Sequence, residues 1–179
     1  PELVDDVIWG CVQQVGAQSF NIGRNAVLAA GWPESVPATT LDRQCGSSQQ
    51  AVHFAAAGLV AGHYDIVVAG GVEAMSLIPM GAGIGKDVGF PYPPTVLERY
   101  DVPTFNQGIG AEMMAAKWGF DRMACDAFAA QSHERLAAAV DAGRLERQIA
   151  PVTLPDGSVL SADEGLQAVP VANQQVCGV

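Results

Sequence analysis

The sequence is poor in basic and aromatic residues. Nine Lys and Arg side chains stand against 19 Asp and Glu, which gives a formal net charge of −10. A surface that binds nucleic acid or an anionic membrane needs clustered positive charge, so we expect neither partner. Aromatic residues make up 7% of the chain and hydrophobic residues 49%. We therefore expect a sizeable core built from Ala, Val, Leu and Ile.

The sequence also lacks a membrane-length apolar run, an export signal and paired cysteines. Its longest apolar run, AVHFAAAGLVAG at residues 51–62, is too short to span a bilayer. The chain opens on PELVDDVIWG, with neither an initiator Met nor an export pattern, so we expect an unsecreted piece of a longer protein. The four cysteines are far apart, which predicts reduced thiols in a cytoplasmic protein. They are Cys11, Cys45, Cys125 and Cys177.

The first part of the chain alternates strands with helices. Strands are expected at 5–12, 37–44 and 65–71, and helices at 21–31 and 46–61. Asn21 is expected to cap the first helix and Gly31 to end it. The second helix is apolar on almost every side and the last strand is a continuous apolar run, so we expect a buried helix and an interior parallel strand. This alternation predicts a layered α/β domain.

The sequence changes character after Ser76. Residues 79–108 are rich in Gly and Pro and predict a long irregular segment. Two helices are expected next, the second from Asp121 to about Ala142, and a hairpin around Pro-Asp-Gly is expected at 150–162. The apolar stripe of that second helix consists of Cys125, Phe128, Ala129, Ser132, Leu136 and Val140. We expect an α/β domain over residues 1–76 and an inserted lobe over residues 77–179.

Cys45 is the candidate nucleophile, in the stretch LDRQCGSSQQAV (41–52). It directly precedes the helix expected from about Gly46, and a helix N-terminus favours the thiolate, the nucleophilic form of cysteine. Gly46 would let the backbone turn sharply and a ligand approach closely, while Ser47 and Ser48 suit a first helical turn. The amide of Cys45 is a candidate donor to an oxyanion. On spacing alone, a cysteine that only packs remains the commoner case.

A family resemblance changes that balance. LDRQCGSSQQAV, followed by VVAGGVEAMS (67–76), resembles the reactive-cysteine region of the thiolases, the 3-ketoacyl-CoA and acetoacetyl-CoA thiolases. The lead-in GRNAVLAAGWPESVPATTLDRQCGSS is similar to the same region. The stretch QGIGAEMMAAKWGFDRMACDAFAAQSHERLAAAVDAGRLERQIAPV is similar to their loop domain, and SADEGL (161–166) to the segment that follows. The resemblance covers about residues 5–166, with three motifs in the family's order.

The resemblance implies an α/β fold, a thiolase-like layered α-β-α half-fold with an inserted irregular and helical loop domain, truncated at both ends. It implies that Cys45 takes the acyl group of a 3-ketoacyl-CoA and passes it to the thiol of a second CoA, as in fatty acid β-oxidation. Coenzyme A is then a co-substrate held partly by the loop domain. No tightly bound cofactor is implied, and no residue is assigned to CoA binding. The implied assembly is a homodimer or homotetramer.

Three departures from the family pattern bear on activity. Asp42 stands where thiolases usually carry Asn, and a carboxylate so close to Cys45 disfavours a thiolate unless a cation such as Arg43 offsets it. Asn106 and Gln107 stand where the short-chain subfamily has a His, which argues against a strict acetoacetyl-CoA enzyme. The family's Gly-His-Pro histidine and Cys-x-Gly cysteine have no counterpart, so we expect the isolated chain to be inactive or nearly so.

Other motifs fail the patterns of catalytic sites. GHYD holds His63 without a following Pro, and VCGV holds Cys177 without a second Gly, so neither residue is expected to be catalytic. MGAGIGKDVG (80–89) matches no phosphate-binding pattern and predicts a flexible loop. No group of His, Cys and acidic residues has the spacing of metal ligands, so we expect no metal site.

Three further side chains are expected to be structural. His53 lies in the apolar helix, where it would be a core histidine or an interface contact. Glu73 follows the twin glycines and would cap the next turn. His133 is expected to face solvent from an amphipathic helix.

Two other functions stay open at this point. A decarboxylating condensing enzyme of the same superfamily also uses a cysteine at a helix N-terminus, although the lobe at 77–166 argues against it. The other is a truncated product that acts only as a binding or oligomerisation module, because thiolase-like halves dimerise through the strand and helix that flank the cysteine.

Overall fold

The structure is a computed structural model of the chain, and it describes residues 1–85, 87 and 89–165. The chain divides into two compact units, Pro1–Asp101 and Val102–Val179, each of which is described by itself. The assignment of residues 1–76 to an α/β domain and of 77–179 to a loop domain remains a prediction.

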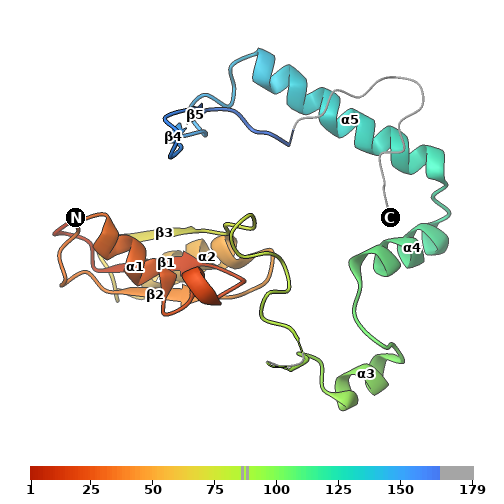
Figure 1. Cartoon of the computed structure of the whole chain (residues 1–179), viewed down its shortest axis with the longest axis horizontal. Coiled ribbons are helices and arrows are strands. Elements are labelled where there is room, and N and C mark those ends of the chain that lie inside the picture. The colour runs from red at the N-terminus through yellow and green to blue at the C-terminus, as the bar shows by residue number, and fades with distance from the viewer. Residues whose placement is uncertain (86, 88, 166–179) are drawn as a thin grey trace. The chain divides into compact units, whose positions relative to one another are not determined.

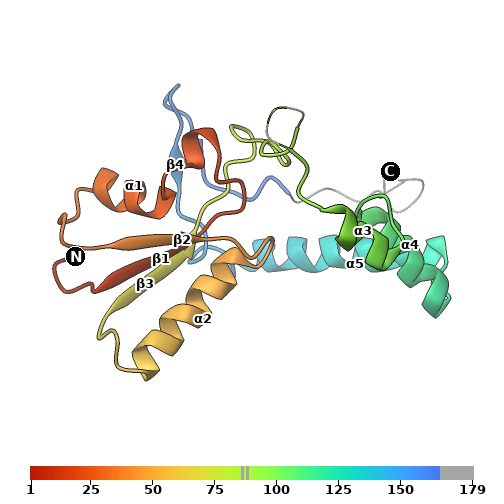
Figure 2. The ribbon, with the colours of Figure 1, turned by 90° about the horizontal axis from the view of Figure 1, so that it is seen from below.

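Three parallel strands form the sheet of the first unit in the order β2-β1-β3 (Figures 1 and 2). They are β1 (Asp6–Gly10), β2 (Ala38–Leu41) and β3 (Val67–Gly71). Val7 of β1 pairs with Ala38 of β2 and with Val68 of β3. All three strands lie within the predicted ranges. The prediction that the last strand is interior is wrong, because only β1 pairs with β3 in the described part of the chain.

The two helices of the predicted α/β layer cover opposite faces of this sheet (Figure 2). Successive residues of a strand point to opposite faces. Val7 therefore packs with Val27 of α1 (Ile22–Ala29), and Ile8 packs with Ala51 and Ala55 of α2 (Ser47–Val60). The layered α-β-α arrangement is confirmed.

Helix α1 begins and ends as the sequence predicts. The side chain of Asn21 accepts a hydrogen bond from the amide of Arg24 at 3.3 Å and therefore caps the helix. The helix is followed by Gly31 with a positive φ of 72°, a conformation that glycine adopts without strain.

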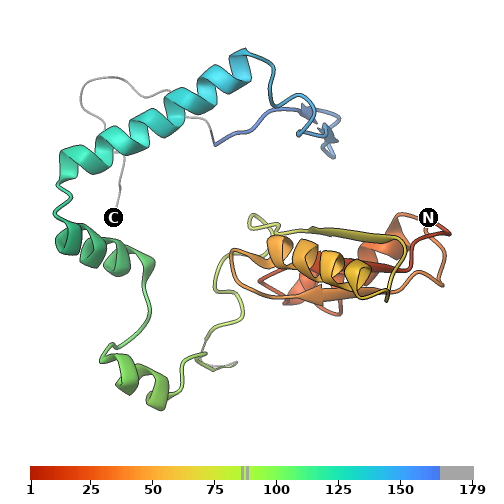
Figure 3. The same cartoon turned by 180° about the vertical axis from the view of Figure 1, so that it is seen from behind.

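Helix α2 is not buried on almost every side, as its composition predicted. Ser47, Ala51, Ala55 and Gly58 are its buried residues. Figure 3 shows α2 in front of the sheet. Its other side is exposed, with exposed fractions of 53% for Val52 and 48% for Phe54. The helix is apolar in composition, but one sheet covers only one of its faces, and the described residues provide no second layer.

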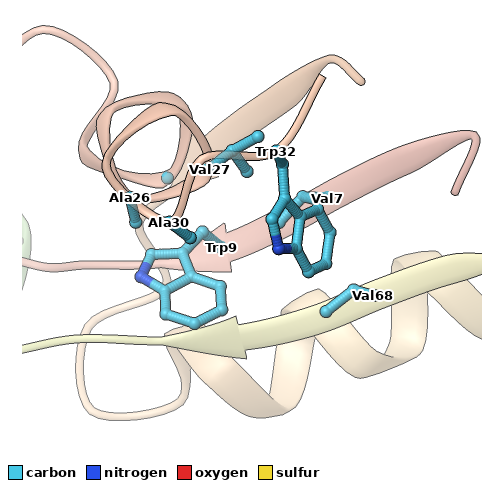
Figure 4. A pocket seen from close by; sticks show the side chains of 8 residues that line it. Val7, Trp9, Ala26, Val27, Ala30, Trp32 and Val68 are labelled. Carbon is cyan, nitrogen blue, oxygen red and sulfur yellow. The ribbon is translucent and has the colours of Figure 1, made fainter. Parts of the chain in front are cut away.

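A shallow apolar hollow of about 290 Å³ lies where α1 meets the sheet (Figure 4). Its lining consists of Val7, Trp9, Gly23, Ala26, Val27, Ala30, Trp32 and Val68. None of these side chains is ionisable or nucleophilic, so the hollow has no chemistry of its own.

The segment predicted to be irregular contains a short helix, α3 (Pro94–Tyr100). Two helices follow it, α4 (Gln107–Trp118) and α5 (Arg122–Asp141), as expected. Pro94 stands in the first turn of α3, where its missing N–H costs no hydrogen bond. No described helix is long and apolar enough to cross a membrane.

In α5, the less exposed side matches the predicted apolar stripe only in part. Ala129 and Leu136 of the stripe are half-buried, as is His133 outside it, whereas Phe128 of the stripe is 77% exposed. His133 was predicted to be solvated, but its Nδ1 atom is buried and has no hydrogen-bond partner in the described part of the chain. Spacing alone therefore predicted only part of the less exposed side of α5 and was wrong about His133.

The predicted hairpin is present as β4 (Val152–Thr153) and β5 (Val159–Leu160), which pair antiparallel. Gly157 has a φ of 83° in the turn between them, the left-handed geometry that the Asp-Gly pair predicts.

Candidate active site

Cys45 lies at the carboxyl edge of the parallel sheet. The segments that leave the three strands, after Gly10, Leu41 and Gly71, all start at this edge because the strands run in the same direction. In open α/β sheets this is the edge at which ligands bind. Cys45 lies between β2 and α2, two residues before the helix begins at Ser47.

Two glycines allow the first turn of α2 to pack directly on the strand ends. A Cβ atom added to Gly10 would lie 2.5 Å from the backbone nitrogen of Ser48. A Cβ added to Gly71 would lie 2.6 Å from the carbonyl oxygen of Gly10. No side chain fits at either position, so both glycines set the depth at which the helix start, and with it Cys45, is held.

Gln44, and not Gly46, makes the sharp turn at the candidate nucleophile. Gln44 has a φ of 48°, in the left-handed region that non-glycine residues rarely occupy. Gly46 has a φ of −102°, which any residue adopts. The prediction that Gly46 provides the turn is therefore wrong. A Cβ on Gly46 would meet only the carbonyl oxygen of Arg43 at 3.5 Å, so the space above it is open.

Short hydrogen bonds hold the turn around Cys45. The hydroxyl of Ser47 accepts from the amide of Arg43 at 3.0 Å and donates to the carbonyl of Gln44 at 2.7 Å. The carboxylate of Asp42 accepts from the amide of Gln44 at 2.5 Å. Asp42 and Arg43 do not form one of the ion pairs found among the described residues. The carboxylate is thus oriented by Gln44 rather than offset by its neighbour.

The three described cysteines differ in access to solvent. Cys45 and Cys125 are exposed, and Cys11 is 1% exposed. Burial raises the pKa of the Cys11 thiol, and the nearby carboxylates of Glu73 and Asp42 raise it further. Cys11 is therefore held as an unreactive thiol beneath the edge where Cys45 is open to solvent.

A polar cluster that the sequence did not reveal lies at the same edge. The amide side chain of Gln18, in the short 3-10 helix η1 (Gly16–Gln18), is 3% exposed and donates to a carboxylate oxygen of Glu73 at 2.9 Å. Glu73 also accepts from the amides of Val12 at 2.8 Å and Gln13 at 3.3 Å. Glu73 therefore caps the loop after β1, and the prediction that it caps its own following turn is wrong.

The charge state of Glu73 follows from these contacts. Burial raises the pKa of its carboxyl, but the hydrogen bonds from Gln18, Val12 and Gln13 outweigh burial and hold the pKa below the ordinary value. Glu73 therefore stays ionised at neutral pH and keeps all its acceptor sites for these donors.

The histidines lie away from Cys45 or face solvent. His63 follows α2, whose 14 residues place it roughly 20 Å along the helix axis from the helix start at 1.5 Å per residue. His53 is exposed, so the prediction of a core histidine is wrong and an interface contact stays a prediction. Asn106 caps α4 through the amides of Gly108 and Ile109, and Gln107 is the first residue of that helix.

Cys177 lies outside the described residues, as does part of the glycine-rich loop at 80–89. A search of the described residues finds no group of His, Cys, Asp and Glu that could hold a metal ion.

Comparisons with known proteins agree with this arrangement. The steroid 3-ketoacyl-CoA thiolase of Mycobacterium tuberculosis is 44% identical over 171 residues, which cover 92% of this chain and 42% of that protein. The 3-ketoacyl-CoA thiolase of Erwinia tasmaniensis is 43% identical over 152 residues, 85% of this chain and 38% of that protein. This chain thus spans about two fifths of the length of these relatives.

The fold has a counterpart of known structure. The crystal structure of the dimeric peroxisomal thiolase of Saccharomyces cerevisiae matches with a TM-score of 0.78 and 33% identity, over 94% of this chain and 42% of that one. The family model described as thiolase, N-terminal domain, matches residues 1–174. Sequence, fold and family model agree, and the chain belongs to the thiolase family.

Proposed function

We propose that this chain supplies the nucleophile of a 3-ketoacyl-CoA thiolase, and that Cys45 is the residue that takes the acyl group. The observation that carries the proposal is the exposed thiol of Cys45 at the start of α2, on the carboxyl edge of the parallel sheet. The substrate class comes from the relatives, which are named 3-ketoacyl-CoA thiolases and belong to the acyltransferases.

The chemistry divides one difficult cleavage into two acyl transfers. The Cys45 thiolate forms a bond to the 3-keto carbon, and negative charge moves to the keto oxygen, for which the amide of Cys45 is the proposed hydrogen-bond donor. When the carbonyl re-forms, the bond between the keto carbon and the alpha carbon breaks. Acetyl-CoA leaves as its enolate and takes a proton from a general acid. A deprotonated CoA thiol then attacks the acyl-cysteine, releases the shortened acyl-CoA and restores the thiolate.

We also propose that the 179-residue chain alone does not turn over. The mechanism needs a base for the nucleophile and an acid for the enolate. Glu73 and Asp42, the carboxylates at this edge, are occupied by hydrogen bonds, and His63 lies at the far end of α2. The described residues around Cys45 thus provide the nucleophile without its proton-transfer partners.

The reactivity of Cys45 is tested within the chain itself, because Cys125 is a matched control. Both thiols are exposed, and Cys125 is the fourth residue of α5. Iodoacetamide at neutral pH, followed by peptide mass spectrometry, is expected to modify Cys45 about tenfold faster than Cys125, with Cys11 unmodified. Equal rates at Cys45 and Cys125 would contradict the proposed role.

Turnover is tested on the protein at its full encoded length. Cys45→Ala is expected to lower kcat/KM for CoA-dependent cleavage of a 3-ketoacyl-CoA by about a thousandfold or more, and Cys125→Ala to leave it unchanged. The 179-residue chain is expected to show background cleavage only. Robust cleavage by that chain would refute its inactivity, and turnover of malonyl thioesters in place of 3-ketoacyl-CoA would identify a decarboxylating enzyme instead.

The assembly and setting proposed for the enzyme are a homodimer or homotetramer in the cytoplasm, with residues 77–179 contributing to CoA binding. The dimeric state of the yeast relative supports the first part. Light scattering on the full-length protein tests it, and a monomer that is fully active would contradict it.

A further inference from the structure

We propose that Gln18 and Glu73 are positioning residues of the Cys45 site, acting together as a clamp that fixes the start of the CoA-binding lobe. The proposal rests on the function proposed above. The clamp is defined here as Gln18, Glu73 and the three backbone positions to which they bond, Val12, Gln13 and Ala74.

The clamp joins two segments that are far apart in the sequence. The side chain of Gln18 donates to the carbonyl of Gln13 at 2.8 Å and to Glu73 at 2.9 Å, and accepts from the amide of Ala74 at 2.7 Å. The carboxylate of Glu73, in the second segment, accepts hydrogen bonds from the amides of Val12 and Gln13 in the first. Both amide hydrogens of Gln18 are thereby used, and its burial at 3% exposure makes each bond costly to lose.

The two joined segments flank the site. The first leaves β1 at Gly10, and the second leaves β3 at Gly71, the two glycines against which the first turn of α2 packs. The amide of Val72 donates to the carbonyl of Gly10 at 2.9 Å, so the segments are bonded where they begin. The clamp extends this link beyond the carboxyl edge of the sheet, the edge at which Cys45 also lies.

The clamp also lies beside residues 78–83, among the first residues of the lobe. A Cβ added to Gly16 would lie 3.2 Å from the Cδ1 atom of Ile78, and one added to Gly83 would lie 3.5 Å from a methyl of Val15. Residues 78–83 therefore run alongside the loop that contains Gln18. Glu73 and Ala74 come immediately before this stretch, so their bonds set the direction in which the chain leaves the sheet.

This placement predicts an effect on binding rather than on the reacting atoms. Gln18 and Glu73 are bonded to each other and to backbone, and neither bonds to Cys45. Loosening the clamp is expected to disturb residues 72–83, where the lobe begins, and to leave the helix start at Cys45 packed on Gly10 and Gly71. A change that weakens ground-state and transition-state binding equally raises KM and leaves kcat in place.

The deciding experiment is steady-state thiolysis by the full-length protein with variants of Gln18. Gln18→Glu places a second carboxylate against Glu73 and removes both donors, and is expected to raise KM for 3-ketoacyl-CoA and CoA about tenfold with kcat within about threefold. Adding Glu73→Gln to Gln18→Glu restores a donor between the two side chains but leaves a carboxylate facing the carbonyl of Gln13, so it is expected to reverse only part of the increase in KM. Gln14→Ala, which removes a bond to Cys11 in the same loop at 3.1 Å, is the matched control and is expected to leave KM unchanged.

Unchanged KM in Gln18→Glu, or a fall in kcat at constant KM, would overturn the proposal. If Gln18→Glu does not fold, the uncharged variant Gln18→Met is measured in its place with the same expected KM increase. Iodoacetamide modification of Cys45 needs no lobe and is expected to keep its rate in every clamp variant. An inert Cys45 in the parent protein would defeat the proposed function, whereas a reactive Cys45 with unaltered KM in the variants would defeat only the clamp.

Discussion

The two units of the chain differ in what stabilises and delimits their helices. In the first unit, α1 and α2 bury small side chains against a sheet and share clusters centred on Val7 and Ile8. In the second unit, α4 and α5 have no buried residue. Their ends are instead defined locally, by side-chain caps at Asn106 and Asp121 and by Gly119 with a φ of 70°.

The difference separates two sources of order. Helices in proteins gain most of their stability from packing, and short helices without it are marginal in water. The first unit therefore holds its shape by its own core, and the position of Cys45 depends on that core. In the second unit, local capping residues determine where the helices begin and end. Large apolar side chains of these helices remain exposed within the described residues, including Met113, Trp118 and Phe128.

The largest expected effect breaks the core of the first unit. Ile8→Ala removes a side chain that is 4% exposed and is expected to destabilise the first unit by about 3 kcal/mol. Phe128→Ala removes a side chain that is 77% exposed and is expected to change stability by less than about 0.5 kcal/mol. Hydrogen exchange read by mass spectrometry measures both, because peptides from the two units are resolved. Similar losses in the two variants would show that α5 is packed as firmly as β1.

An intermediate effect is expected from the cap of α5. The carboxylate of Asp121 accepts from the amide of Ala124 at 2.8 Å, and Asp121→Ala is expected to cost α5 about 1 kcal/mol. Exchange protection should fall in α5 and stay constant in β1. The control is Asp126→Asn, which breaks the exposed ion pair with Arg122 and is expected to cost less than about 0.5 kcal/mol. Lost protection in β1 after Asp121→Ala would contradict a purely local role for this cap.

The smallest expected effect is a loss of stability of the first unit at acidic pH. Asp5 accepts from the amides of Ile66 and Asp65, which lower its pKa below the ordinary 3.8, and the pKa of Glu73 is held below the ordinary 4.5. Both carboxyls have a lower pKa folded than unfolded, so their contribution is present above about pH 4.5 and is lost as the pH falls through the folded values.

Urea unfolding of the first unit between pH 7 and pH 3 measures this decline. Asp5→Asn and Glu73→Gln are each expected to flatten it, because the substituted side chain no longer titrates. A parent protein whose stability is unchanged down to pH 3 would show that neither carboxylate contributes through these bonds.

The sequence predicted what depends on near neighbours. The strands, α1 with its Asn21 cap, and the hairpin at Gly157 all follow from signals a few residues apart. The position of Cys45 just before a helix was also predicted from its sequence neighbours. Helix α3 was missed because the Gly and Pro content of its surroundings concealed a segment in which Pro94 is compatible with a helix start.

What depended on distant parts of the chain was not predicted. The burial of α2 and the edge position of β3 depend on which layers and strands lie beside them, and composition does not encode this. Gln18 bonds to residues 55 and 56 positions away, and no local motif marks it. The sharp turn was assigned to Gly46 because glycine turns most freely, whereas in the structure Gln44 adopts the left-handed conformation and its carbonyl accepts from the hydroxyl of Ser47.

The side of α2 that the described residues leave exposed has a practical consequence for work with this chain by itself. Its exposed side chains include the hydrophobic residues Val52, Phe54, Leu59 and Val60. Such exposed apolar patches promote self-association of proteins in concentrated solution. Preparations should therefore be kept dilute, and substituting Val60, which is 90% exposed, by Lys is a conservative route to better-behaved samples because that side chain contributes almost nothing to the fold.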